Sequence, residues 1–181
     1  MNWPNRITIA RVALIPVIVT LLQFDVPFCR AAALVAFVLA CCTDWLDGYL
    51  ARRFQIVTNL GKFLDPVADK LLVLSTMVAL CGLGRFPAWV CIVVLFRELA
   101  VDGLRLVAVE QGRVIAAGKL GKIKTTLQML TLAAVLLEPG FTGDFPLVQV
   151  LMAAAVIMTL WSGIDYFVRN GSVLRQGGKA V

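Results

Sequence analysis

Four aspartates in an apolar part of the chain are the residues best suited to chemistry: Asp44, Asp47, Asp65 and Asp69. Placing such charges in hydrocarbon would cost about 2.5–3.5 kcal/mol each, so something must compensate them. Carboxylate oxygens are the ligands that Mg²⁺ and Mn²⁺ prefer, and four of them fit a pair of ions about 3.5–4 Å apart. Such a pair can neutralise a diphosphate and polarise its phosphorus. The aspartates therefore predict a site for two ions, Mg²⁺ or Mn²⁺.

The aspartates belong to a longer pattern, D-x2-D-G-x2-A-R-x8-G-x3-D-x3-D, which covers residues 44–69 without a departure. Gly48 and Gly61 would let a large ligand approach the backbone, although small residues in membrane helices also serve helix packing, and Ala51 is open to both interpretations. Arg52 can bind a phosphate with its forked guanidinium, or it can anchor the helix at the membrane surface.

The spacing of the pattern places it on two helices. At 100° per residue, the first two aspartates share one helix face with Gly48 and Ala51. Gly61 and the last two aspartates are spaced four residues apart and share a face of the next helix. Two helices are therefore expected to present two aspartates each to a common gap.

The composition predicts an all-α integral membrane protein. Of the 181 residues, 60% are apolar and 15% are charged, and the mean hydropathy is +0.89. Windows of about 20 residues match the roughly 30 Å hydrocarbon thickness of a bilayer. They predict six transmembrane helices, at 7–23, 31–53, 63–83, 86–109, 122–137 and 147–168. We find no linker that would divide the chain, so residues 1–181 are expected to form a single domain.

The Lys and Arg residues predict the orientation in the membrane. Arg30 and Arg85 lie in one set of loops, and all the others lie at the opposite ends of the spans. Both termini are therefore expected to face the cytoplasm. The net charge of +6 is better explained by anionic lipid head groups than by nucleic acid, because the basic residues edge apolar spans.

Several other classes of chemistry are disfavoured. The chain has no histidine, which excludes Ser-His and Cys-His catalysis. The five cysteines form no C-x-x-C motif, which argues against a zinc site or a disulfide framework. The G-x-G-D string of an intramembrane aspartyl protease is absent. A cation-coupled transporter stays as an alternative from another class, since intramembrane aspartates also mark ion pathways.

The complete pattern resembles the signature of the CDP-alcohol phosphotransferase family, membrane enzymes that move a phosphatidyl-type group from a CDP-linked donor to an alcohol. The resemblance implies that Asp44, Asp47 and Asp65 bind metal, and that Asp69 is the catalytic base and also touches an ion. It implies that the remaining motif residues contact the CDP-lipid, with CMP as the leaving group. It further implies a homodimer. Because the aspartates lie toward the expected cytoplasmic ends of their spans, the active site of this cell-membrane protein is expected to face the cytoplasm.

The acceptor alcohol is predicted from strings outside this pattern. They are Asn5-Arg6-Ile7-Thr8 leading to Arg11, Arg97-Glu98-Leu99, Gly103-Leu104-Arg105 and the stretch Lys119 to Met129. These strings resemble family members that use sn-glycerol 3-phosphate, so the expected substrates are CDP-diacylglycerol and glycerol 3-phosphate, and the expected products are phosphatidylglycerophosphate and CMP. Inositol phosphate, serine and phosphatidylglycerol stay open as other acceptors.

The basic residues on the expected cytoplasmic side are the candidates for binding the acceptor phosphate: Arg97, Arg105, Lys122 and Lys124. Each of them could instead satisfy the preference for positive charge on the inner side, and Arg97 either pairs with Glu98 or binds substrate. Asn5 and Thr8 are candidates for the donor lipid, although Asn5 could equally cap the first helix.

Overall fold

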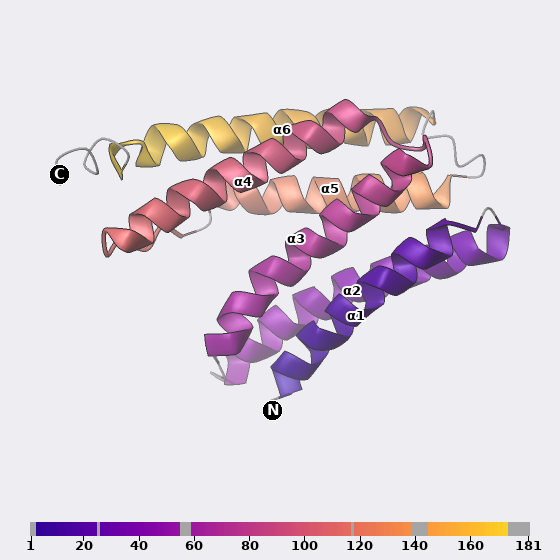
Figure 1. Cartoon of the computed structure of the whole chain (residues 1–181), viewed down its shortest axis with the longest axis horizontal. Coiled ribbons are helices and arrows are strands. Elements are labelled where there is room, and N and C mark those ends of the chain that lie inside the picture. Colours follow the sequence, from indigo (N-terminus) through magenta and orange to yellow (C-terminus); the bar gives the residue numbers. More distant parts are fainter. Residues whose placement is uncertain (1–2, 25, 55–58, 117, 139–144, 174–181) are drawn as a thin grey trace. The chain divides into compact units, whose positions relative to one another are not determined.

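The computed structural model contains six α-helices (Figure 1). It describes residues 3–24, 26–54, 59–116, 118–138 and 145–173, and the side chains of 3–7, 44–54 and 59–65 lie outside that description. The helices are α1 (Trp3–Leu22), α2 (Pro27–Phe54), α3 (Asn59–Gly82), α4 (Ala88–Glu110), α5 (Lys119–Leu137) and α6 (Pro146–Asn170). The described residues contain no strand. The all-α prediction is therefore confirmed, and each helix overlaps one predicted span.

Two helices end in the same glycine-dependent turn. Gly84 and Gly112 both have a φ of 70°, which costs least at glycine. After α3, the amide of Gly84 donates to the carbonyl of Cys81 and the amide of Arg85 donates to that of Leu80. The same pair of bonds follows Gly112 at the end of α4. This arrangement satisfies carbonyls that a helix end would otherwise leave open, and it reverses the chain sharply.

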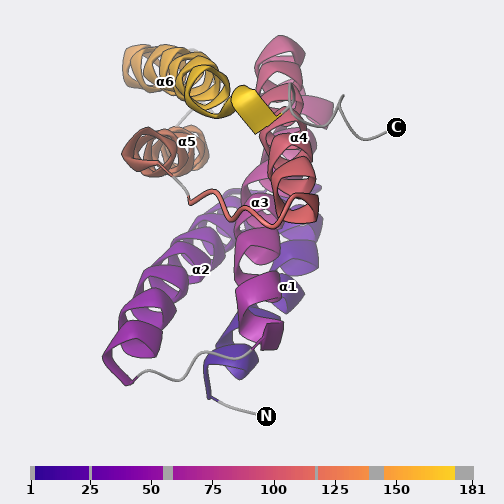
Figure 2. The ribbon, with the colours of Figure 1, turned by 90° about the vertical axis from the view of Figure 1, so that its left-hand side faces the viewer.

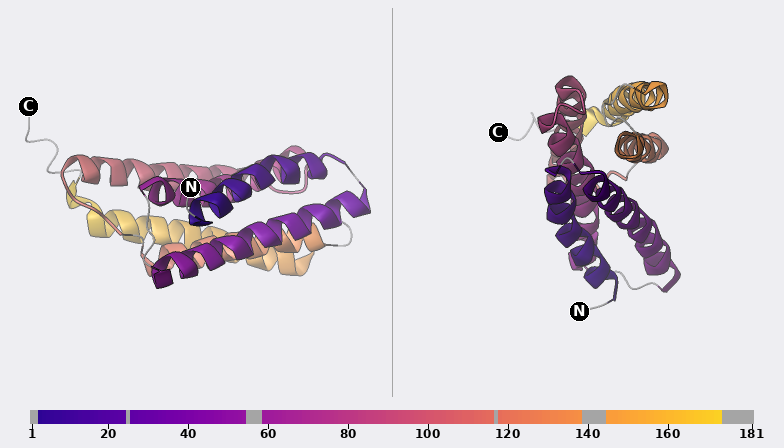
Figure 3. Two further views of the ribbon diagram at one scale, coloured as in Figure 1. Left: turned by 90° about the horizontal axis from the view of Figure 1, so that it is seen from below. Right: turned by 90° about the vertical axis from the view of Figure 1, so that its right-hand side faces the viewer.

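The described chain divides into two compact units, and the first consists of residues 1–87 and 132–145. In this unit α1 and α2 form an antiparallel hairpin, and α1 contacts both α2 and α3 (Figure 2). Figure 3 shows the same three helices from two further directions. The core between them is apolar and includes Ile18, Ala33, Phe37, Ala40, Leu72 and Met77. These contacts hold the two helices of the aspartate pattern in one packed unit.

The second unit consists of residues 88–131 and 146–181. Helices α4 and α6 pack against each other and run in the same direction, and α5 runs in the opposite direction (Figure 1). An apolar cluster of Val101, Leu104, Ala108, Tyr166 and Val173 joins α4 to the end of α6. A hydrogen bond from Gln128 Nε2 to Thr159 Oγ1, 3.0 Å long, joins α5 to α6.

The distribution of polar side chains suits helices that lie in lipid. On α4, Phe96 and Leu99 are 75% and 69% exposed, whereas Glu98 between them is only 6% exposed. Large apolar side chains facing outward with charges facing inward are the pattern expected in a bilayer. Among the described residues, α5 and α6 are long and apolar enough to cross a membrane, and shorter apolar helical stretches cover Thr8–Leu22 and Pro27–Thr43. The six crossings and the cytoplasmic termini stay predictions.

Candidate active site

The four aspartates of the pattern lie on two helices of the first unit. Asp44 and Asp47 are in α2, and Asp65 and Asp69 are in α3. Helices α2 and α3 contact each other and both pack on α1. The backbone thus bears out the two-helix arrangement that the spacing predicts. The described side chains do not include Asp44, Asp47, Gly48, Ala51, Arg52, Gly61, Asp65 or Asn5, so their assigned roles stay predictions.

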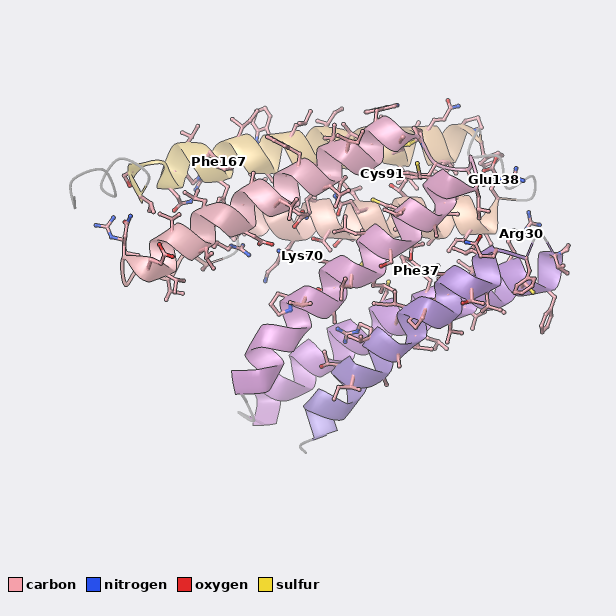
Figure 4. All side chains as sticks on the ribbon, in the orientation of Figure 1. Arg30, Phe37, Lys70, Cys91, Glu138 and Phe167 are labelled. Carbon is pink, nitrogen blue, oxygen red and sulfur yellow. The ribbon has the colours of Figure 1, made fainter. Side chains whose placement is uncertain are left out.

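Asp69 is the motif aspartate whose side chain the structure describes, and it lies beside a buried arginine. Nη1 of Arg11 in α1 is 3.7 Å from Oδ1 of Asp69, and the Arg11 side chain is fully buried while that of Asp69 is 31% exposed. Thr8 is also buried, one helical turn before Arg11. Lys70, which follows Asp69, marks this part of α3 in Figure 4. The pairing places a cation from the first helix against the predicted catalytic base.

Hard divalent cations fit the donor set of this unit. Two neighbouring helices supply four carboxylates, and hard oxygen donors of this kind suit Mg²⁺ and Mn²⁺ better than softer metals. Within the described side chains, no group of three or more His, Cys, Asp or Glu residues gathers elsewhere as a competing metal site. The candidate metal ligands are therefore the motif aspartates: Asp44, Asp47, Asp65 and Asp69.

A cluster of charges lies inside the second unit, between α4, α5 and α6. Nη1 of Arg97 donates to Oε1 of Glu98 over 3.1 Å, and Nζ of Lys124 donates to the same oxygen. All three side chains are largely buried. A single carboxylate thus holds two cations that were both predicted to bind the acceptor phosphate. The cluster has two cations and one carboxylate, so removal of Glu98 would leave two buried cations without their counter-charge.

Helix α6 completes the surroundings of Arg97. Nη2 of Arg97 donates to Oγ of Ser162 over 3.2 Å. A Cβ added to the neighbouring Gly163 would lie 3.1 Å from Cγ of Arg97, so the stem of the arginine crosses α6 at the glycine. Figure 4 locates Cys91 toward the beginning of α4 and Phe167 toward the end of α6. In the sequence, Arg97 follows Cys91 on α4, and Ser162 precedes Phe167 on α6.

Arg105 has a separate set of partners, about two helical turns further along α4. Its Nε donates to the hydroxyl of Tyr166 over 3.0 Å, and its guanidinium carbon lies 5.4 Å from the centre of the Tyr166 ring. Nη1 is 4.0 Å from Oδ1 of Asp102, one turn back on the same helix. The hydrogen bond and the cation–π contact together restrict where this guanidinium can lie. Lys122, in contrast, is exposed on α5.

The polar and small residues of the last helix were not predicted to contribute to a site, because the span 147–168 resembles a generic apolar helix. Thr159, Ser162, Gly163 and Tyr166 follow the spacing i, i+3, i+4, i+7, and all four are buried. This spacing could have identified them. Polar residues that recur at helical spacing within an apolar span face protein rather than lipid. Arg11 was noted only at the end of a resembling string, although it lies one turn from Thr8.

Comparison with known proteins assigns the family. The model of the CDP-alcohol phosphatidyltransferase family matches residues 1–161. A protein of Bacillus subtilis (strain 168) named CDP-diacylglycerol--glycerol-3-phosphate 3-phosphatidyltransferase is 44% identical, over 96% of this chain and 97% of its own length. The protein of that name from Escherichia coli (strain K12) is 39% identical over 91% of this chain and 92% of its own. A probable phosphatidylglycerophosphate synthase of Mycobacterium tuberculosis (strain ATCC 25618 / H37Rv) is 38% identical over 93% and 81%.

The chain therefore belongs to the CDP-alcohol phosphatidyltransferase family, and the resemblance predicted from the aspartate pattern is confirmed. It is an enzyme of the transferase class, and the enzymes of this family generally depend on a divalent metal.

Proposed function

We propose that this enzyme transfers the phosphatidyl group of CDP-diacylglycerol to sn-glycerol 3-phosphate, giving phosphatidylglycerophosphate and CMP in glycerophospholipid biosynthesis. The observation that carries the proposal is the match with relatives named for this reaction over more than nine tenths of the chain. That length includes both the aspartate helices and the buried cations of α4 and α5. Inositol phosphate, serine and phosphatidylglycerol are the less favoured acceptors, and a cation-coupled transporter is not favoured.

The donor would bind at the aspartate pattern. Two ions, Mg²⁺ or Mn²⁺, held by the four motif aspartates would supply charge neutralisation for the diphosphate and make its phosphorus more electrophilic. Arg52 would bind a donor phosphate as a fork, and Gly48, Ala51 and Gly61 would leave room for the CDP-lipid near the backbone. Asn5 and Thr8 of α1 would line the same ligand.

The reaction proper needs one proton acceptor. The hydroxyl oxygen of glycerol 3-phosphate attacks the lipid-bearing phosphorus, the bond from that phosphorus to the CMP oxygen breaks, and Asp69 takes the hydroxyl proton. Arg11 orients this carboxylate from α1 through the ion pair described above. CMP leaves with both electrons of the broken bond, so no covalent enzyme intermediate is required.

Arg97, Arg105, Lys122 and Lys124 are the proposed ligands of the acceptor phosphate. A phosphate dianion suits convergent cations, and the planar fork of arginine gives it two hydrogen bonds at once. The buried pair of Arg97 and Lys124 around Glu98 supports this role most strongly, because cations are retained in an apolar unit only at high cost. Serine carries no phosphate and has no net charge at neutral pH, so it would make less use of several convergent cations than glycerol 3-phosphate.

We further propose that residues 1–181 act as a single domain with six transmembrane helices in the cell membrane, both termini in the cytoplasm, and the active site open to the cytoplasm. The distribution of Lys and Arg supports this orientation, and a water-soluble acceptor would reach the site from that side. Membrane lipids surround the chain in this arrangement, and nucleic acid is not a partner. A homodimer is the assembly that the family resemblance implies.

The proposal is tested by CMP release from protein purified in detergent and supplied with CDP-diacylglycerol and Mg²⁺. Glycerol 3-phosphate, inositol phosphate, serine and phosphatidylglycerol are offered in separate reactions. Release with glycerol 3-phosphate alone is the expected result. Release with another acceptor would keep the family chemistry and remove the proposed acceptor.

A further inference from the structure

The path of the Arg97 side chain depends on a glycine of the last helix. A Cβ built on Gly163 lies 3.1 Å from Cγ and 3.9 Å from Nε of Arg97. The first distance is shorter than ordinary van der Waals contact between carbon atoms. Any larger residue at position 163 would therefore displace the stem of this arginine.

The far end of the side chain is fixed, so the stem has little freedom to move away. Its guanidinium donates from Nη1 to Glu98 and from Nη2 to Ser162. Ser162 is itself held, because its hydroxyl donates to the carbonyl of Thr159 over 3.2 Å. The Nε of Arg97 is buried and has no hydrogen-bond partner among the described atoms. A shift of the stem would thus be passed on to the guanidinium and to both of its hydrogen bonds.

We propose that Ser162 and Gly163 of α6 are positioning residues for Arg97, and that they set the place of its guanidinium for the phosphate of the acceptor. The inference rests on the proposed function, since it takes Arg97 as a ligand of that phosphate. Both residues lie just beyond the part of the chain that the family model matches, which ends at residue 161. The competing explanation is that Gly163 only lets α4 and α6 approach closely, as small residues often do.

Kinetics of Gly163→Ala separate the two explanations. If Gly163 positions Arg97, the KM for glycerol 3-phosphate rises about 2- to 10-fold, the range expected when one hydrogen bond is lost or strained, and the KM for CDP-diacylglycerol stays unchanged. Gly103→Ala is the matched control, because Gly103 lies in the interior of α4 and a Cβ there meets nothing within 4 Å. Both substitutions gain the same helix propensity.

Three more variants keep the result decisive. In an Arg97→Lys background, Gly163→Ala should add little, because lysine cannot span the same two partners. Ser162→Ala should raise the KM for glycerol 3-phosphate in the wild-type background, and Ser162→Thr, which keeps a hydroxyl, should restore most of the loss.

The outcomes of this experiment are distinct. Equal KM values in Gly163→Ala and Gly103→Ala, or a lower thermal midpoint with both substrates equally affected, would overturn the positioning role while the proposed function stands. Wild-type protein that releases no CMP with glycerol 3-phosphate would instead overturn the proposed function, and the inference with it.

Discussion

Arg11 and Asp69 form an ion pair between α1 and α3, with 3.7 Å between Nη1 and Oδ1. The arginine side chain is fully buried, whereas the aspartate side chain is 31% exposed. A buried guanidinium 3.7 Å from a carboxylate oxygen attracts it electrostatically and so favours one position of that carboxylate. The first helix thus contributes directly to the predicted catalytic base.

Arg11→Lys is expected to lower kcat by about 10- to 100-fold, the size of effect that follows a small misplacement of a catalytic group. Lysine keeps the charge and loses the fork. The matched control is Arg169→Lys, since Arg169 pairs with Asp165 on the exposed end of α6, with 2.7 Å between Nε and Oδ1. Unchanged kcat in Arg11→Lys would show that the pair serves only to neutralise charge.

Asp69→Asn is expected to lower kcat by about 10²- to 10⁴-fold, the usual contribution of a general base. Binding of the CDP-lipid should largely persist in the presence of metal, because three motif aspartates remain. Equilibrium binding of CDP-diacylglycerol with and without Mg²⁺ measures this separately from turnover. Asp165→Asn is the matched control, since that side chain is also 31% exposed and paired with an arginine. Full activity in Asp69→Asn would remove it as the base.

Glu98→Gln is expected to destabilise the protein, because it leaves Arg97 and Lys124 buried without their shared carboxylate. Breaking a buried pair costs about 3–5 kcal/mol, which should appear as a lower thermal midpoint in detergent. Adding Lys124→Met removes one of the two uncompensated cations, so the double variant should recover part of the loss. It should not recover acceptor binding. A double variant less stable than Glu98→Gln would contradict this account of the charge cluster.

Tyr166→Phe is expected to raise the KM for glycerol 3-phosphate by about 2- to 10-fold, the range for one hydrogen bond. It removes the hydroxyl that accepts from Arg105 and keeps the ring beneath the guanidinium. Arg105→Ala and Lys124→Ala should raise the same KM further and affect the KM for CDP-diacylglycerol less. If the two KM values rise together, these residues support folding or anchoring rather than the acceptor.

Local rules were enough to predict the helices. The span predicted at 147–168 corresponds to helix α6, Pro146–Asn170. Its bounds can be predicted because the apolar run begins next to a proline, which suits the first turn of a helix, and ends at polar residues. The aspartates were placed on α2 and α3 for the same reason, because spacing along one helix is a local property.

The partners of the basic residues were not predictable in this way. Glu98 receives Lys124 from 26 positions away, and Arg97 reaches Ser162 across 65 positions. Such contacts depend on how separate helices pack, which a single sequence does not state. The pairing of Arg97 with Glu98 is the exception. These two residues are adjacent in the sequence, and their ion pair was among the predictions.

The most direct measurement of the central claim is the mass of the lipid product formed from ¹³C-labelled glycerol 3-phosphate and CDP-diacylglycerol. Detergent-purified wild-type protein with Mg²⁺ should yield labelled phosphatidylglycerophosphate together with CMP, and a chelator should abolish both until Mg²⁺ or Mn²⁺ is restored. Labelled product that forms unchanged in the chelator would contradict the metal site. CMP release without label in the lipid, or no release at all, would contradict the proposed transfer to glycerol 3-phosphate.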